Sequence, residues 1–338
     1  AAPVHLGTDI VHHDVGALTG ELQGVLPSDP PAGAGHDHNP SLAESVHGER
    51  SYAPAPVREA LPMRDDRPSR TAQGVLAERA VLHALGVIDD RFAAGMLTPG
   101  MARIVSAVHH GPAFLTERSV TLAGLAARIN WFDMQVIEAL DAGIDQVAVI
   151  GAGYDSRAWR FARDGVRYFE LDHPATQADK VARAPSDGPA YVAVDLTDAT
   201  ASDALTRHGL DVRRPTFFVV EGVTMYLTKE VLHRALVDLR KVAAVGSRLS
   251  VNFSAPGHTG TARNRRQLLL QRMARIGSAE GFRLEVDRVG AGELVAAAGW
   301  EVASVTGLRA AARHLPNHAR LAVDAVNDQA ALVLADRT

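Results

Sequence analysis

The sequence predicts one doubly wound α/β domain, in which helices cover both faces of a largely parallel, Rossmann-like sheet behind a helical lead-in. Three observations predict it. From residue 146 onward, short apolar runs rich in β-branched and aromatic residues alternate with helical stretches. A turn containing two glycines follows the first of these runs, and apolar residues at helical spacing precede it. Together these features indicate a sheet with a ligand site at the carboxyl ends of its strands.

The first 145 residues divide into two parts. Residues 1–67 are dense in proline, glycine and histidine and show no sustained helix or strand period, which predicts an irregular N-terminal arm. Residues 68–145 predict the helical lead-in, with apolar positions recurring at helical spacing over 71–110 and 122–142. The last of these helices is expected to bury Phe132, Val136 and Ile137 on one side and to stop at Gly143.

Residues 146–338 are expected to form the ligand-binding core. Each predicted strand is a short apolar run, and the segments between the runs are long enough for crossover helices. The runs are QVAVI (146–150), VRYFEL (166–171), AYVAV (190–194), TFFVV (216–220), RLSVNF (248–253), WEVASV (300–305) and AALVLA (330–335).

Composition narrows the function. A formal net charge of −4 over 338 residues gives no field that would attract nucleic acid or an anionic membrane. The chain has no cysteine, so disulfides and thiolate chemistry are excluded. No apolar run approaches the ~20 residues of a membrane span, and the first residues lack the order of a signal peptide. We therefore expect a cytoplasmic protein acting on a small molecule, with a homo-oligomer left open.

The turn after the first predicted strand is the strongest local sign of a ligand. Gly151 and Gly153 allow the backbone to turn tightly and to approach a ligand. The dinucleotide-binding fingerprint has a third glycine where this chain has Ser156, which favours a cofactor without a pyrophosphate. Asp172 ends the second strand, where a carboxylate can accept hydrogen bonds from both ribose hydroxyls, and Asp195 closes the third. Acids at successive strand ends indicate nucleoside binding.

At this point the chain resembles the leucine carboxyl methyltransferase family, in particular its bacterial secondary-metabolite branch. The resemblance implies a seven-stranded class I methyltransferase sheet and S-adenosylmethionine as the cofactor. Its motifs follow one another in consistent order over roughly residues 69–255. They are SRTAQGVLAERA (69–80), ARINWFD (127–133), QVAVIGAGYDSRAWRF (146–161), YFELDHPATQADK (168–180), VAVDLTD (192–198) and PTFFVVEGVTMYL (215–227).

The resemblance also implies which residues bind the cofactor. Arg79 and Arg128 fall where the family has basic residues facing the methionine carboxylate; some relatives have lysine in place of Arg79, which keeps the charge but not the geometry. The other matching positions are Gly151 in the glycine turn, Asp172 at the ribose, Asp195 and Leu196 at the adenine pocket, and Glu221 facing the cofactor.

Three histidines suggest a metal site for the acceptor. His314 and His318 are four residues apart and belong to the connection before the last strand. In the implied fold the seventh strand is antiparallel and inserts between the fifth and sixth, so this connection lies over the active site. His258 follows the fifth strand and emerges at the same edge. We therefore expect these histidines to bind a divalent metal, zinc or similar, although each could equally be a surface or carbonyl-bonded residue.

A metal there would chelate a 2-oxo acid and stabilise its enolate, so the best interpretation is methylation at the β-carbon of an α-keto acid in natural-product biosynthesis. The alternative is an O-methyltransferase acting on a carboxyl or hydroxyl group. An NAD-dependent oxidoreductase and a non-catalytic adenosine-binding module are more remote. The proton-abstracting base stays open between Tyr226 and an unliganded histidine, and Arg309 is a candidate to hold the substrate carboxylate.

Overall fold

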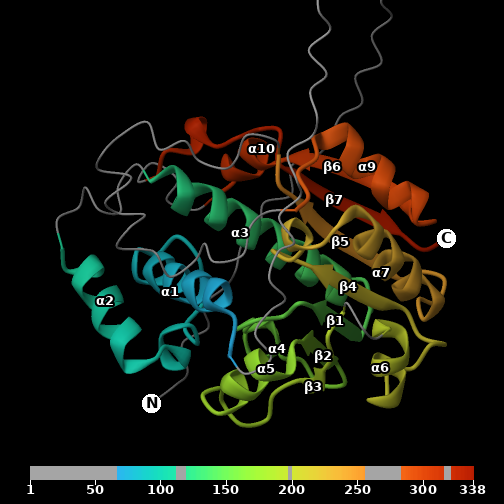
Figure 1. Ribbon diagram of the computed structural model, residues 1–338, viewed down its shortest axis with the longest axis horizontal. Coiled ribbons are helices and arrows are strands. Elements are labelled where there is room, and N and C mark those ends of the chain that lie inside the picture. The colour runs from blue at the N-terminus through green and yellow to red at the C-terminus, as the bar shows by residue number, and fades with distance from the viewer. Residues whose placement is uncertain (1–66, 112–118, 197–199, 256–282, 316–320) are drawn as a thin grey trace, which may run out of the picture. The chain divides into compact units, whose positions relative to one another are not determined.

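The computed structural model describes residues 67–111, 119–196, 200–255, 283–315 and 321–338. Its sheet has seven strands in the order β3-β2-β1-β4-β5-β7-β6. The first five strands are parallel, and β7 runs antiparallel to both of its neighbours. This confirms the doubly wound fold class (Figure 1). The strands are β1 (Gln146–Ile150), β2 (Arg167–Asp172), β3 (Ala190–Ala193), β4 (Thr216–Val220), β5 (Arg248–Phe253), β6 (Glu301–Gly307) and β7 (Ala331–Asp336).

Side chains of each central strand alternate between two apolar layers. In β1, Val147 and Val149 belong to one layer, whereas Ala148 and Ile150 belong to the other, as the two-residue period of a strand requires. Figure 1 shows the helices of the two layers on opposite sides of the sheet. The first layer contains α3 (Val120–Asp141) and α10 (Leu308–Ala312), and the second contains α6 (Ala201–Arg207), α7 (Lys229–Lys241) and α9 (Arg288–Ala297).

Helix α3 differs from its prediction at one position. Phe132 and Val136 are fully buried, as expected, but the side chain of Ile137 is 36% exposed. The expectation for Ile137 was wrong because consecutive residues lie about 100° apart around a helix, and Ile137 falls beyond the edge of the face that buries Phe132, Val136 and Leu140. The helix ends at Asp141, and Gly143 follows it with a φ of 86°, a left-handed conformation that glycine adopts without strain.

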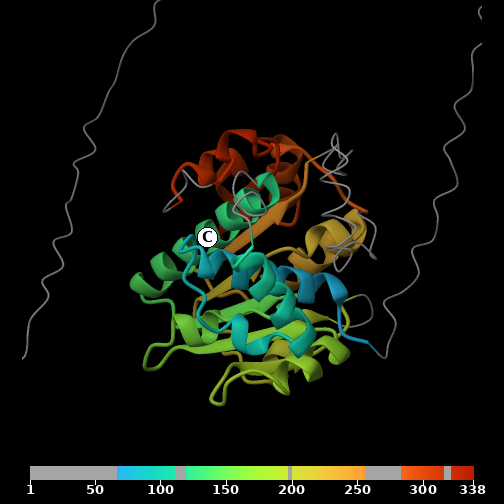
Figure 2. The ribbon, with the colours of Figure 1, turned by 90° about the vertical axis from the view of Figure 1, so that its left-hand side faces the viewer.

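The lead-in consists of α1 (Arg70–Ala84), the 3-10 turn η1 (Ala94–Met96) and α2 (Pro99–His109). Ser69 and Thr98 cap the two helices, because their hydroxyl oxygens accept backbone N–H bonds that would otherwise lack a partner. Figure 2 shows α1 and α2 in front of the sheet. Tyr154, from the loop after β1, packs into their apolar cluster. The lead-in is therefore anchored beside the glycine turn.

Residues 1–66, which carry nearly all of the predicted arm, lie outside the described residues. Within the described part of the chain, none of the helices is both long enough and apolar enough to cross a membrane.

Candidate cofactor and acceptor site

The glycine turn joins the carboxyl ends of β1 and β2. Gly151 and Gly153 have φ angles of 67° and 52°, in the left-handed region that favours glycine. The Ala152 N–H donates to the Leu171 carbonyl at 2.9 Å, and the Gly153 N–H donates to Asp172 Oδ2 at 2.5 Å. These two bonds tie the turn to the carboxyl end of β2.

Gly151 has a second reason to be glycine. A Cβ at this position would lie 2.9 Å from Cγ2 and 3.0 Å from Cβ of Val223, which is closer than the usual contact distance between non-bonded carbon atoms. Gly143 has a similar positive φ, but nothing lies within 4 Å of the Cβ it would carry. The two glycines therefore separate the effect of strain from the effect of a clash.

We expect Gly151→Ala to destabilise the protein by about 2–4 kcal/mol, combining about 1–2 kcal/mol of left-handed strain with overpacking against Val223. Gly143→Ala should show only the strain. Urea unfolding of both variants measures the difference, and adding Val223→Ala to Gly151→Ala should recover part of the loss. Equal losses for the two single variants would contradict the close approach.

Asp172 is oriented by the turn that it supports. Its carboxylate accepts the Gly153 N–H and, at 2.7 Å, the His173 N–H, so further lone pairs stay available to a ligand. Burial raises the pKa of Asp172 above its usual value, while the two backbone N–H groups and Lys180 act in the opposite direction. The structure thus places a half-buried acid with spare acceptor capacity at the end of β2.

Helix α1 closes one side of this turn. A Cβ on Gly153 would lie 3.2 Å from the Cβ of Ala72 in α1. At the start of the helix, the Ser69 N–H donates at 3.0 Å to the hydroxyl of Thr176 in α5 (Pro174–Val181). These contacts hold the lead-in against both the turn and the helix after β2.

A connected network of charged side chains lies behind the turn. Its members come from α1, the segment after α1, α3, the glycine turn, the short helix α4 (Arg157–Arg160) and the end of β4. Ion pairs of 2.5–3.9 Å link all of them. Four guanidinium groups balance four carboxylates, as buried charges require. The network comprises Arg79, Arg128, Arg157, Arg160, Asp90, Asp133, Asp155 and Glu221.

The structure brings the two predicted arginines to this network. Arg79 is 6% exposed; its Nη2 lies 2.7 Å from Asp90 Oδ2 and donates to the Ser156 hydroxyl at 3.0 Å. Its Nε is buried without a hydrogen-bond partner among the described residues. Arg128 donates from Nε to Glu221 Oε1 at 3.0 Å. Both arginines therefore have protein carboxylates as partners, and Arg79 also keeps an unused buried donor.

Glu221 is the point where the arginines converge. Burial acts to raise the pKa of its carboxyl, but Arg157, Arg128 and Arg79 outweigh burial and hold the pKa below its usual range. Glu221 is therefore an ionised, half-buried carboxylate at the end of β4. The neighbouring Glu78, on α1, behaves differently, because burial raises its pKa to about 7 despite the attraction of Arg128.

These shifts predict how the free energy of unfolding depends on pH. Glu221 and Asp90 have folded pKa values below the usual range, so the unfolded chain binds more protons and stability falls as the pH drops below ~4. Glu78 and Glu170 have folded pKa values of about 7, so the folded chain binds more protons and stability falls as the pH rises from ~5 to 7. Urea unfolding across pH should show a maximum near pH ~5.

In the Glu78→Gln and Glu170→Gln variants, the free energy of unfolding should fall less steeply than in the wild type as the pH rises above that maximum. A wild-type profile that rises steadily from pH 5 to 7 would contradict the assignment.

The remaining predicted cofactor residues lie at the same carboxyl edge. Asp195 and Leu196 follow β3, are half-buried, and lie beside the β2 end, where the Val194 N–H donates to the Asp172 carbonyl at 2.9 Å. Tyr226 is half-buried in the 3-10 turn η3 (Thr224–Tyr226) after β4.

The acceptor side is described only in part. The register aligns Phe253 at the end of β5 with Ala331 at the start of β7 and Gly307 at the end of β6, so these strand ends share the cofactor edge. Arg309, in α10, donates from Nε to the Val326 carbonyl at 2.9 Å, and His314 is exposed just after the helix. His258 and His318 lie outside the described residues, and the residues that are described contain no cluster of three metal-ligating side chains.

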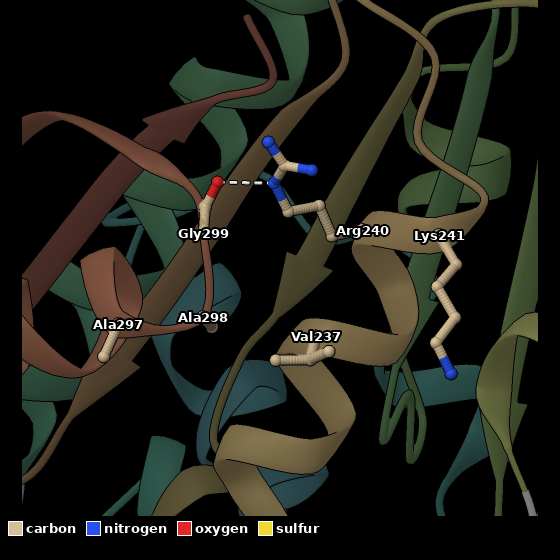
Figure 3. Close-up of a pocket in the computed structure, with 6 residues that line it drawn as sticks. All are labelled: Val237, Arg240, Lys241, Ala297, Ala298 and Gly299. Carbon is tan, nitrogen blue, oxygen red and sulfur yellow. Dashed lines mark hydrogen bonds between the residues drawn. The ribbon is translucent and has the colours of Figure 1, made fainter.

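A shallow pocket elsewhere belongs to the opposite edge of the sheet. Figure 3 shows Arg240, near the end of α7, donating from Nε to the Gly299 carbonyl between α9 and β6. Helix α7 leads into the amino end of β5, and α9 leads into the amino end of β6. Both strands run parallel to β1, so their amino ends lie at the edge opposite the glycine turn. The pocket therefore lies away from the glycine turn. Its lining residues are Val237, Arg240, Lys241, Ala297, Ala298 and Gly299.

Sequence reasoning missed the partners of the predicted arginines. Asp133, Asp155, Arg157 and Arg160 all lie within the quoted motifs, but their types and spacing do not show which of them pair. One signal in the sequence could have indicated a charged network here: the charged residues Asp155 and Arg157 follow the two glycines closely, beside an apolar strand. Lys180, which is 1% exposed, gave no comparable sign.

Comparison with known proteins identifies a family. The model of a family described as leucine carboxyl methyltransferase matches residues 72–239. Relatives from Mycobacterium avium and Mycolicibacterium smegmatis, both named "Putative S-adenosyl-L-methionine-dependent methyltransferase", are 33% and 31% identical. The alignments cover 67% and 69% of this chain and 76% and 82% of those proteins. A crystal structure named "putative methyltransferase", from Thermobifida fusca, superposes with a TM-score of 0.49 at 14% identity, over 81% of this chain and 96% of that one.

The relatives and the sheet order together define an S-adenosylmethionine-dependent methyltransferase. Within that class, the chain belongs to the leucine carboxyl methyltransferase family.

Proposed function

We propose that this enzyme methylates a small carboxylate-bearing metabolite, and that its acceptor is an α-keto acid methylated at the β-carbon in natural-product biosynthesis. One observation carries the proposal. The ends of β5 and β6 and the start of β7 share the edge that holds Asp172 and Glu221, and His314 lies just after α10, which follows the end of β6.

The residues at this edge fit S-adenosylmethionine. Gly151 gives the turn its left-handed backbone, Asp172 has spare lone pairs for the ribose hydroxyls, and Arg79 has a free buried donor for the methionine carboxylate. Asp195 and Leu196 are proposed to meet the adenine, Arg128 the carboxylate, and Glu221 the cationic amino group. When bound, this cofactor supplies a methyl group on a sulfonium.

Methyl transfer needs the acceptor atom to be aligned with the methyl group of the cofactor, and it needs water to be excluded from the site. The 3-carbon of the acceptor loses a proton to a base, and its electron pair forms the new bond to the methyl carbon. The carbon–sulfur bond breaks, its electrons stay on sulfur, and S-adenosylhomocysteine is left. Tyr226 or an unliganded histidine is proposed as the base, and Arg309 as the partner of the acceptor carboxylate.

His258, His314 and His318 are proposed to hold a divalent metal, zinc or similar. A metal in this place would polarise the 2-oxo acid and favour loss of the proton from the 3-carbon. The second candidate is O-methylation, which the description of the matching family, leucine carboxyl methyltransferase, favours directly. A carboxylate oxygen is already nucleophilic and needs neither the metal nor the base.

One experiment separates the two candidates. Metal-treated and chelator-treated enzyme is incubated with labelled cofactor and a panel of 2-oxo acids, simple carboxylic acids and phenols, and the methyl group is located by mass spectrometry and NMR. Metal-dependent methylation at the 3-carbon of a 2-oxo acid supports the proposal. Chelator-insensitive formation of an ester or ether replaces it with O-methylation.

His314→Ala tests the metal site separately. If His314 binds the metal, we expect transfer to a 2-oxo acid to fall by at least ~100-fold, while calorimetry shows cofactor affinity nearly unchanged. His208→Ala is the matched control, because His208 lies just beyond α6 and its Nδ1 donates to the Ala204 carbonyl within that helix. Loss of cofactor binding and transfer together, or of neither, would count against the assignment.

A further inference from the structure

Arg157 ties together three separate parts of the candidate site. Its side chain is 1% exposed. Nε donates to Asp133 in α3 at 2.8 Å, Nη1 to Asp155 in the glycine turn at 2.5 Å, and Nη2 to Glu221 after β4 at 2.6 Å. The guanidinium carbon also lies 5.8 Å from the centre of the Phe132 ring. Because its donors are fixed in one plane, this guanidinium determines how the three carboxylates lie relative to one another.

We propose that Arg157 is a positioning residue for the cofactor, which holds the Glu221 carboxylate toward the amino group of S-adenosylmethionine and fixes it relative to the glycine turn. The inference rests on the proposed function, in which Glu221 faces that amino group. Among the described residues, Arg157 is the arginine that binds both Glu221 and the turn, since Arg128 binds Glu221 from α3.

The electrostatics around Glu221 support this role. The charged groups that act on it are Arg157 from α4, Arg128 from α3, Arg79 from α1 and Asp155 from the turn. The arginines lower its pKa, whereas burial and Asp155 raise it. A lysine in place of Arg157 has its three donors on a single nitrogen, so it cannot reproduce the directions in which Nε, Nη1 and Nη2 reach the three carboxylates. The pKa of Glu221 should then rise, and cofactor binding should begin to fail at a higher pH.

Arg160 provides a matched control. It lies on the same short helix, its side chain is 4% exposed, and it binds the same Asp133 at 2.5 Å and 2.9 Å. Its described partners do not include Glu221. Arg157→Lys and Arg160→Lys should therefore cost similar stability, while only the first disturbs Glu221.

The experiment measures cofactor affinity by calorimetry from pH 5 to 8, melting temperature, and the KM for cofactor and kcat. Binding of S-adenosylmethionine to the wild-type protein is measured first, because a wild type that does not bind it would overturn the proposed function itself. We expect Arg157→Lys to weaken cofactor binding by about ten- to a hundredfold, mainly in KM, and to move the acid limb to higher pH. Wild-type affinity and pH profile in Arg157→Lys, or equal effects in Arg160→Lys, would overturn the proposal.

Asp155→Asn keeps the test decisive if Arg157→Lys does not fold. This near-isosteric change weakens the hold of the turn on Arg157 Nη1 and leaves the Glu221 side chain itself in place. We expect a severalfold loss of cofactor affinity in the wild-type background and almost none in a Glu221→Gln background, because both changes act through one carboxylate. Independent, multiplying losses would show that the turn acts without Glu221 and would also overturn the proposal.

Discussion

Replacing Lys180 with methionine is expected to destabilise the protein by about 3–5 kcal/mol, the usual consequence of leaving a buried charge without its partner. Lys180 and Glu170 are each 1% exposed and form an ion pair inside the layer between β2 and α5. The rings of Trp159 and Tyr191 lie 5.5 Å and 6.0 Å from Nζ. Because both side chains are buried, solvent cannot take the place of the ammonium group, so urea unfolding should show the full effect.

The pH dependence of that loss identifies its cause. Burial already raises the pKa of Glu170 to about 7 with Lys180 present, and without Lys180 the pKa should rise further. A folded pKa above the unfolded value makes stability fall as the pH rises, so Lys180→Met should lose more at pH 8 than at pH 5. A loss independent of pH would point to packing instead.

Two controls accompany this variant. Lys241→Met removes a lysine whose side chain is 65% exposed and which pairs with Asp238, and we expect a change of at most about 1 kcal/mol. Combining Lys180→Met with Glu170→Leu removes both charges and should restore most of the lost stability. A double variant as unstable as Lys180→Met would show that the ion pair is not the cause.

Asp172→Asn is expected to weaken S-adenosylmethionine binding by about 10- to 100-fold, because a hydrogen bond to a charged group contributes about 1.5–3 kcal/mol. The asparagine keeps the size of the side chain but has only one acceptor oxygen. Two backbone N–H groups, of Gly153 and His173, already donate to the carboxylate, so the amide would also turn a donor toward a donor. Calorimetry with the cofactor and with S-adenosylhomocysteine measures the loss.

Asp336→Asn is the matched control, since Asp336 also ends a strand but lies at the opposite edge, paired with Arg248 at 3.1 Å. Its cofactor affinity should equal that of the wild type. Unchanged affinity in Asp172→Asn would remove the carboxylate from the proposed ribose site and leave the glycine turn as the main contact.

The strands were predictable because their signal is local. Runs 146–150, 216–220 and 248–253 match β1, β4 and β5 at both ends, and the others differ by one or two residues. Alternate burial on a pleated sheet acts on consecutive residues, so it is visible in the sequence. Helix α3 shows the limit of such patterns, because Ile137 is apolar and at helical spacing yet stays exposed.

The candidate site was predictable only as a set of residues. The glycines and the strand-end acids follow from local requirements: a left-handed turn needs glycine, and parallel strands end at one edge. Their partners do not follow. Arg128 and Glu221 bind each other across 93 residues of sequence, and Ser69 and Thr176 across 107. Nothing within either segment indicates such a pair.

By itself, therefore, the sequence determined the sheet, the glycine turn, Asp172 at the end of the neighbouring strand β2, and the methyltransferase family. Each of these depends on residues close together along the chain. Only the tertiary structure decided that Arg79 and Arg128 share their charge with a neutral network of carboxylates, and that Arg157 lies at its centre. The physical reason is that a buried charge must have a partner close in space, and folding brings that partner from any part of the chain.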